Sequence, residues 1–159
     1  IVSNAYDHAS RRVLKFTPTA TYTFVYDGWN LVQEVINNQQ STITNQYVWG
    51  KDLSGTMQGA GGVGGLLAVS MGGQYYFPSH DANGNIVAYV DESGSVVAEY
   101  AYDAFGSTIS QSDTMSDAFP HRFSTKYFDA ETGLYYYGYR FYNPILHRWL
   151  NRDMQEQVS

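Results

Sequence analysis

The sequence contains no cysteine, little charge and no long apolar run. Of its 159 residues, 15% are charged, and the formal net charge is −6. The absence of cysteine excludes disulfides and thiolate metal sites. The longest apolar run, Gly61 to Met71, is too short and too rich in glycine to cross a bilayer, which takes about 20 residues. Sparse Lys and Arg argue against a nucleic-acid partner, because phosphate binding needs concentrated positive charge.

The first residues, IVSNAYDHASRR, lack the charged segment and apolar core of a signal peptide. They also begin in the middle of a pattern and without Met. We therefore expect the chain to be a fragment of a longer polypeptide, or one end of it.

Aromatic residues and glycine are plentiful. Phe, Trp and Tyr make up 16% of the chain, and there are 15 glycines. This composition favours strands joined by tight turns. Thr21 to Tyr26 alternates with a period of two, Asp27-Gly28 is typical of a turn, and Asn30 to Ile36 returns. Ile43 to Trp49 continues the pattern. The prediction is an all-β meander of antiparallel hairpins.

A glycine-rich insert, Gly50 to Gly73, interrupts this meander. Its apolar part, Val63 to Val69, could form a buried strand between flexible turns. A phosphate-binding loop is excluded because neither Lys-Ser or Lys-Thr nor a helical pattern follows. Close approach of the backbone or positive φ angles explain the glycines better.

A short turn motif, Asp-x-x-Gly, recurs along the chain. An Asp at the first position can accept a backbone N–H two residues on, and Gly closes the turn in the left-handed conformation. An aromatic residue precedes most of these Asp residues, and repetition at about 20 residues indicates stacked units. The predicted turn residues are Asp7, Asp27, Gly28, Asp81, Gly84, Asp91, Gly94, Asp103, Gly106, Asp129 and Gly133.

The most aromatic stretch, YYYGYRFY, spans residues 135–142. Its alternation predicts one strand with Tyr135, Tyr137, Tyr139 and Phe141 on one face. After it, residues 143–150 suit one short helix, because Asn143 could cap it and Pro144 could occupy its first turn.

These motifs resemble the YD repeats of Rhs proteins, of insecticidal toxin-complex C components and of teneurins. The segment DAETGLYYYGYRFYNP followed by RWLNRD is similar to the Rhs repeat-associated core motif. The resemblance assigns residues 1–109 to YD-type hairpin repeats with the insert at about 50–73, residues 110–153 to the core motif, and residues 154–159 to a divergent tail.

The resemblance implies a β-strip wound in a spiral into a hollow shell, secreted or at the cell surface, that encloses a C-terminal toxin domain. The expected partners are the rest of the shell and that toxin. Many members also cut themselves with an aspartyl protease site, onto which Arg148 and Asp153 align. Met154 stands where the family has Pro, and a second Asp would lie beyond Ser159. We therefore expect a structural scaffold rather than an enzyme.

Two other functions stay open. A cell-surface module could bind carbohydrate or mediate adhesion through the tyrosine-rich strand, and the chain could be the remnant of an autoprotease. No cofactor is expected. The residues also predict no metal site, because the four His are scattered and calcium loops cluster their carboxylates within a dozen residues. These His residues are His8, His80, His121 and His147.

Overall fold

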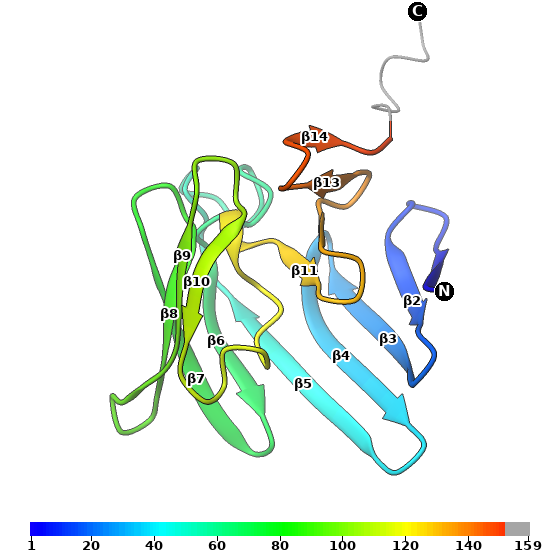
Figure 1. Ribbon diagram of the computed structural model, residues 1–159, viewed down its shortest axis with the longest axis horizontal. Coiled ribbons are helices and arrows are strands. Elements are labelled where there is room, and N and C mark those ends of the chain that lie inside the picture. Colours follow the sequence, from blue (N-terminus) through cyan, green and yellow to red (C-terminus); the bar gives the residue numbers. More distant parts are fainter. Residues whose placement is uncertain (152–159) are drawn as a thin grey trace, which may run out of the picture.

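The structure is a computed structural model that describes residues 1–151, and it consists almost entirely of β-strands (Figure 1). Ten strands form one antiparallel sheet in which every strand pairs with its neighbours in the sequence. They are β1 (Ser3–Tyr6), β2 (Arg12–Phe16), β3 (Ala20–Asp27), β4 (Asn30–Asn38), β5 (Thr42–Trp49), β6 (Leu66–Met71), β7 (Gln74–His80), β8 (Ile86–Asp91), β9 (Val96–Tyr102) and β10 (Thr108–Ser112). The predicted all-β meander of hairpins is confirmed.

The alternation of side chains along these strands places a set of aromatic residues on one face of the sheet, whereas others, such as Tyr75 and Phe77 of β7, are exposed. Phe24 of β3, Tyr47 of β5, Tyr76 of β7 and Tyr89 of β8 are all buried and belong to one hydrophobic core. Neighbouring strands bulge at several points, for example between Val25 and Tyr26. Bulges strengthen the twist of a strand, which suits a sheet that curves.

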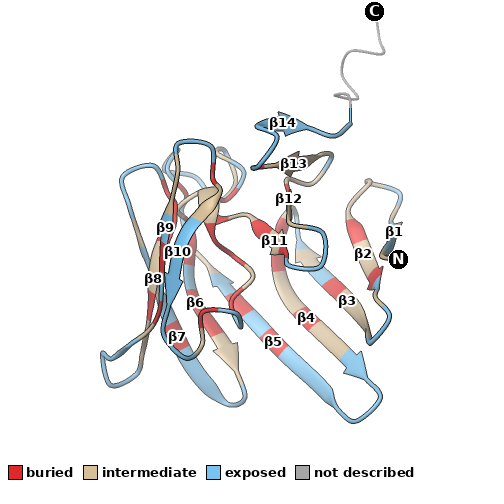
Figure 2. Ribbon diagram, in the orientation of Figure 1, coloured by how far each residue is buried: buried red, intermediate tan, exposed pale blue. Residues whose placement is uncertain are grey.

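The rest of the chain folds back against the aromatic face. A second sheet contains β11 (Tyr127–Asp129), β12 (Leu134–Tyr136), β13 (Phe141–Asn143) and β14 (Arg148–Trp149). A single 3-10 turn, η1 (Phe123–Thr125), precedes it. In Figure 1 the segment leading to β11 crosses the hollow of the curved ten-stranded sheet, and Figure 2 shows buried residues along this crossing.

Stacked rings hold the crossing segment in place. Phe119 is fully buried and stacks on Tyr89 with 3.8 Å between ring centres and 9° between ring planes. Tyr127 meets Phe24 edge to face at 5.6 Å. The edge-to-face contact is a favoured arrangement of aromatic rings, and the nearly parallel pair buries a large apolar area. The core of the molecule therefore lies between the hairpin strip and its own C-terminal part.

The glycine-rich insert has two parts. Its second half is strand β6, which begins at Leu66 and is followed by a tight turn at Gly72 and Gly73, both with positive φ. Its first half, residues 50–65, is an irregular loop (the glycine loop), and Gly50 N donates to Gly65 O across its neck at 2.8 Å. The predicted strand at 63–69 therefore starts three residues too early.

The tyrosine-rich stretch is a hairpin, and the prediction of one strand through it is wrong. The chain turns at Gly138, which has a φ of +87°, and Tyr137 N donates to Arg140 O at 2.9 Å. Aromatic alternation continues through the turn, so periodicity alone could not locate it. Glycine supplies the left-handed conformation that a tight turn requires.

The predicted short helix near the C-terminus is also wrong, because residues 143–150 form the turn and second strand of the β13–β14 hairpin. The Asn143 side chain does accept N–H groups, from Ile145 and Leu146 at 2.9 Å each, but these belong to a turn. His147 then takes a positive φ of 52°, which ends any helical path. Among residues 1–151, no helix is long and apolar enough to cross a membrane.

Candidate functional site

The candidate site is the contact between the first strands of the strip and the C-terminal hairpins, which we call the docking interface. At its centre Arg12 of β2 contacts Asp129 of β11, with 2.5 Å between Nη1 and Oδ2. Lys15 Nζ lies 3.1 Å from Asp129 Oδ1 and 3.2 Å from Glu131 Oε2. Arg12, Lys15 and Asp129 are all buried. Ion pairs this deep hold only if each charge keeps its partner.

Aromatic rings enclose the Arg12 guanidinium. Its central carbon lies 4.5 Å from the ring centre of Tyr136, 4.7 Å from that of Phe24 and 5.1 Å from that of Tyr127. Two of these rings come from the C-terminal hairpins and one from the strip. Cation–π attraction is strongest where water is excluded, as it is here. Burial alone lowers the pKa of Arg12, but the carboxylate of Asp129 outweighs it and raises the pKa.

A second polar cluster surrounds Glu34 of β4, which is 1% exposed. Its carboxylate accepts the hydroxyl of Tyr47 at 2.9 Å, the amide of Asn45 at 3.1 Å and the hydroxyl of Tyr127 from β11. Burial, followed by the charge of Glu34, raises the pKa of both Tyr47 and Tyr127 well above the usual value. Both tyrosines therefore stay neutral donors, and they stabilise the buried carboxylate by hydrogen bonding.

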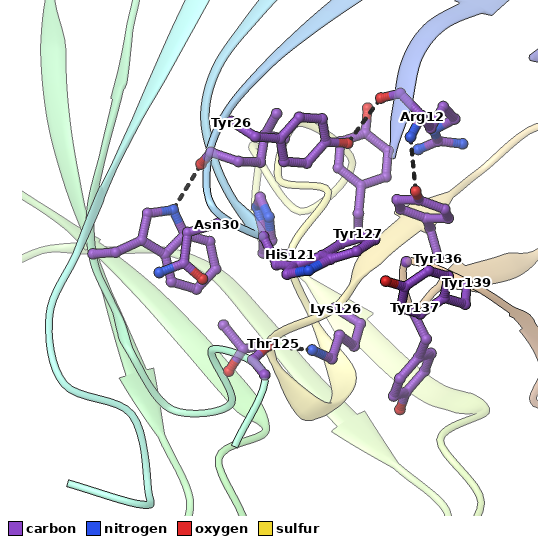
Figure 3. A pocket seen from close by; sticks show the side chains of 15 residues that line it. Arg12, Tyr26, Asn30, His121, Thr125, Lys126, Tyr127, Tyr136, Tyr137 and Tyr139 are labelled. Atoms are coloured by element: carbon purple, nitrogen blue, oxygen red, sulfur yellow. Dashed lines mark hydrogen bonds between the residues drawn. The ribbon is translucent and has the colours of Figure 1, made fainter. Parts of the chain in front are cut away.

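Beside this interface lies a cavity of about 230 Å³, drawn in Figure 3. Its walls come from β3, β4 and β5, from the glycine loop and from the C-terminal hairpins. Among the lining residues are Trp29, Trp49, His121, Lys126 and Tyr137. In Figure 3 the Lys126 side chain lies between Thr125 and Tyr137. We call this space the aromatic cavity.

Two basic residues of the cavity have lowered pKa values. His121 is 3% exposed, and burial, together with the charge of Lys126, lowers its pKa to about 3. Its imidazole is therefore neutral, and Nδ1 has no hydrogen-bond partner among the described residues. Burial lowers the pKa of Lys126 to about 8, against a smaller opposing effect of Asp52.

Asp52 organises the glycine loop. One carboxylate oxygen accepts Ser54 N at 2.9 Å and Ser54 Oγ at 2.6 Å, and the other accepts Ala60 N at 2.7 Å and Gly62 N at 3.0 Å. Although burial alone raises the pKa of Asp52, these hydrogen bonds dominate and lower it to about 2. The loop then reaches the C-terminal part, because Gly64 N donates to Thr125 Oγ1 at 2.8 Å.

The predicted turn residues differ in how the Asp side chain is used, and four of the turns follow the predicted motif closely. Asp81, Asp91 and Asp103 each accept backbone N–H groups two and four positions on, at 2.8–3.0 Å. Each turn is closed by a glycine with positive φ: Gly84, Gly94 and Gly106. Asp7 accepts in the same way from Ala9 and Arg11 at 2.9 Å, with Ser10 in the left-handed position.

The other two turns differ from the motif. Asp27 is the last residue of β3 and pairs with Asn30, so Gly28, with a φ of +58°, and Trp29 form a two-residue turn. At Asp129 the backbone carbonyl, rather than the carboxylate, closes the turn by accepting Gly133 N at 2.8 Å. The Asp129 side chain is instead directed into the docking interface. The motif thus located this residue but not its contacts.

The residues predicted on one strand face have different environments. Tyr135 is fully buried, Tyr137 and Phe141 are half-buried, and Tyr139 is 51% exposed. Tyr137 meets Trp149 edge to face at 4.8 Å, and Tyr139 packs on Trp29 at 4.6 Å. These rings are engaged in packing and do not form the continuous exposed strip that the carbohydrate hypothesis requires.

Of the two residues aligned with the self-cleavage motif, the structure describes only Arg148. Arg148 is exposed on β14, where it pairs with Asn143, and Asp153 lies outside the described residues, as does the tail 154–159. Within residues 1–151 no group of three His, Asp or Glu side chains could hold a metal ion.

Sequence reasoning missed Arg12, Lys15, Glu34, Asp52 and Lys126. The signal for Glu34 was present, because an acidic residue stands at an inward position of the strand 30–36. Arg12 and Lys15 likewise lie in a short strand beside apolar residues. Across the interface, Asp129 is 117 positions from Arg12 and 114 from Lys15, and Tyr127 is 93 positions from Glu34, so no local pattern pairs them.

Comparisons with known proteins agree with this architecture. The sequence pattern of the family described as Teneurin YD-shell matches residues 2–159. The chain is 31% identical over 141 residues to the tRNA nuclease WapA of Bacillus subtilis, which covers 87% of this chain and 6% of that protein. It is 30% identical over 171 residues to double-stranded DNA deaminase toxin A of Burkholderia cenocepacia, which covers 94% of this chain and 12% of that protein.

A solved structure shows the same fold. The crystal structure of TcdB2-TccC3 superimposes with a TM-score of 0.72 at 23% identity, over 99% of this chain and 8% of that one. The chain therefore spans a small part of each of these proteins, 12% at most. The predicted architecture, a segment of a YD-repeat strip, is confirmed.

Proposed function

This chain belongs to the teneurin YD-shell family, and on that premise we propose that it forms the end of a hollow shell that encloses a toxin domain. The chain itself is a structural scaffold of the YD-shell type. Two of its relatives are named as a nuclease and as a deaminase toxin, and it matches only 6% and 12% of their lengths. We infer that the toxic activity belongs to other parts of such polypeptides.

One observation supports the closing role most strongly. The strip presents its aromatic face inward, and the chain then turns back across that face. Arg12 and Asp129, 117 positions apart, form a buried ion pair there. A segment that only continued the strip would add an eleventh strand at the edge of the sheet. The C-terminal part instead closes the hollow from within.

We also propose that the full protein acts outside the cell that makes it, together with the rest of the shell and the enclosed toxin. A shell keeps a toxin harmless to its producer only if the wall excludes proteases and substrates. The docking interface suits this role because the charges of Arg12, Lys15 and Asp129 are paired with one another and its rings exclude water.

The test uses the complete natural polypeptide that carries this segment. Limited trypsin digestion should spare the domain that follows the shell, and the double variant Arg12→Met, Asp129→Leu should expose it to rapid cleavage. Asp27→Asn, at an exposed turn, serves as the control and should leave protection unchanged. Equal digestion rates of the enclosed and the isolated domain would refute encapsulation.

A further inference from the structure

The aromatic cavity contains a cation that lacks a carboxylate partner. None of the salt bridges among residues 1–151 involves Lys126. Its ammonium group donates to Gly61 O and lies 5.4 Å from the ring centre of Tyr137. The carboxylate of Asp52 influences the pKa of Lys126, but both Asp52 oxygens accept N–H groups of the glycine loop. Removing an ammonium group from water is costly, and one carbonyl and one ring offset only part of that cost, so an anion would stabilise it further.

Several polar groups of the surrounding walls are already occupied. Tyr26 OH donates to Arg12 O at 3.0 Å, and Tyr136 OH accepts Arg12 N at 2.8 Å. Trp49 Nε1 donates to Leu31 O at 2.6 Å. A polyhydroxylated ligand such as a sugar would find few free partners here. A ligand with one negatively charged end and an apolar body would meet both the Lys126 ammonium group and the rings.

The size of the cavity limits the ligand further. At about 230 Å³ it is smaller than the sites of drug-sized ligands, which occupy roughly 300–1,000 Å³. The exposed ring of Tyr139 and the side chain of Lys126 lie on the lining, so the space is reached without unfolding the hairpins. Neutral His121 adds a second polar group to the wall.

We propose that the aromatic cavity binds a small aromatic monocarboxylate, whose carboxylate pairs with Lys126 and whose ring packs against Trp29 and Trp49. This site is independent of the scaffold role, because the cavity would bind its ligand whether or not the full shell encloses a toxin. Pairing would satisfy the one cation of the cavity that lacks a carboxylate within the described part of the chain.

The test titrates the chain with 3-phenylpropionate and, separately, with its uncharged amide. Two of the three tryptophans, Trp29 and Trp49, line the cavity, so their fluorescence reports binding, and Trp149→Phe removes the background. The acid should bind at least about tenfold more tightly than the amide, as expected for one ion pair shielded from water. Galacturonate, an acidic sugar, should bind more weakly than 3-phenylpropionate.

Replacing each of two lysines in turn distinguishes a loss of ligand binding from a loss of folding. Lys126→Met should abolish the preference for the acid while leaving the affinity for the amide unchanged, which a merely structural role of Lys126 would not do. Lys51→Met removes an exposed lysine of the same loop and should keep the preference.

Three results would overturn the proposal: equal affinities of acid and amide for the unmodified chain, tighter binding of galacturonate, or no fluorescence change up to about 10 mM ligand. If Lys126→Met does not fold, the relative affinities of the unmodified chain for the acid and the amide still test the proposal.

Discussion

At the scale of single residues, buried polar groups, rather than exposed ones, hold the two parts of this molecule together. Glu34, Asp129, Arg12 and Lys15 are each at most 3% exposed, and each has a partner on the opposite side of the docking interface. Such groups contribute most when every partner is present. Removing one partner leaves a buried charge with too few hydrogen bonds.

The hydroxyl of Tyr127 offers a specific test. Tyr127→Phe keeps the ring packing on Phe24 but removes one of three donors to Glu34. We expect the free energy of unfolding to fall by about 1–3 kcal/mol, the usual range for a buried polar group left unpaired. Urea denaturation measures it. Tyr75→Phe, at an exposed position of β7, should change stability by less than about 0.5 kcal/mol.

Asp52 predicts an acid-dependent change. Its pKa in the folded chain is about 2, below the ordinary value of 3.8, so the unfolded chain binds more protons between these values. Its contribution to stability is complete above about pH 4 and disappears as the pH falls towards 2. In Asp52→Asn this contribution should be absent at neutral pH, and the decline in melting temperature between pH 4 and 2 should be shallower than in the unmodified chain. Parallel curves for the two proteins would contradict the assignment.

At the scale of elements, the turns of the strip are also contact surfaces for the C-terminal part. Phe105 stacks on His147 at 4.0 Å, and Tyr142 OH donates to Phe105 O at 2.9 Å. Both contacts join the turn between β9 and β10 to the β13–β14 hairpin. The same turn motif therefore has different packing surroundings at different positions.

Two glycines of this motif form a matched pair. Gly94 and Gly106 have φ angles of +83° and +88°, so an alanine would be strained at either. A Cβ on Gly94 would meet nothing within 4 Å, whereas one on Gly106 would lie 2.6 Å from the ring of Phe123. We expect Gly94→Ala to cost about 1 kcal/mol from backbone strain alone. Gly106→Ala should cost about 1–3 kcal/mol more, from overpacking. Equal losses in thermal denaturation would show that Phe123 is not held against this turn.

The repeated elements could be predicted well from the sequence, because each strand and turn is determined by residues that are close together in the chain. Alternating rings identified the strands, and Asp at the first position with Gly three residues later identified the turns at Asp81, Asp91 and Asp103. Prediction failed at residues 135–142, where Gly138 bends a chain that continues to alternate, and at residues 143–150, where the signals that suit a helix, Asn143 and Pro144, belong to a turn. The docking interface could not be predicted from the sequence, because Arg12 and Asp129 are far apart in the chain and meet only in the folded molecule.

At the scale of the whole molecule, the ten-stranded sheet has two open edges. Strand β1 lies at one edge and β10 at the other, and four of the five residues of β10 are exposed. Unpaired edges are templates for further strands. A strip of stacked hairpins needs its neighbours to complete these edges, as repeat architectures do.

This arrangement predicts association of the isolated chain. Ile109, at 68% exposure on β10, contributes an apolar surface to that edge. Sedimentation velocity should show oligomers that grow with concentration, and Ile109→Lys should shift the distribution towards monomer, because charge on an edge strand opposes pairing. Ile145→Lys, at an exposed turn, is the control. A chain that stays monomeric and melts sharply and reversibly at every concentration would contradict this view of the edges.

The C-terminal hairpins are docked on the concave face of the strip by groups from both parts. A double-mutant cycle of Arg12→Met and Asp129→Leu, measured by urea denaturation, tests this arrangement most directly. Each single change should lower the free energy of unfolding by about 3–5 kcal/mol, because it leaves a buried charge without its partner. The double change should cost less than the sum by at least about 1 kcal/mol, the coupling expected of residues in contact. Losses that add to within about 0.5 kcal/mol would mean that the two residues do not meet, and the docked arrangement would be wrong.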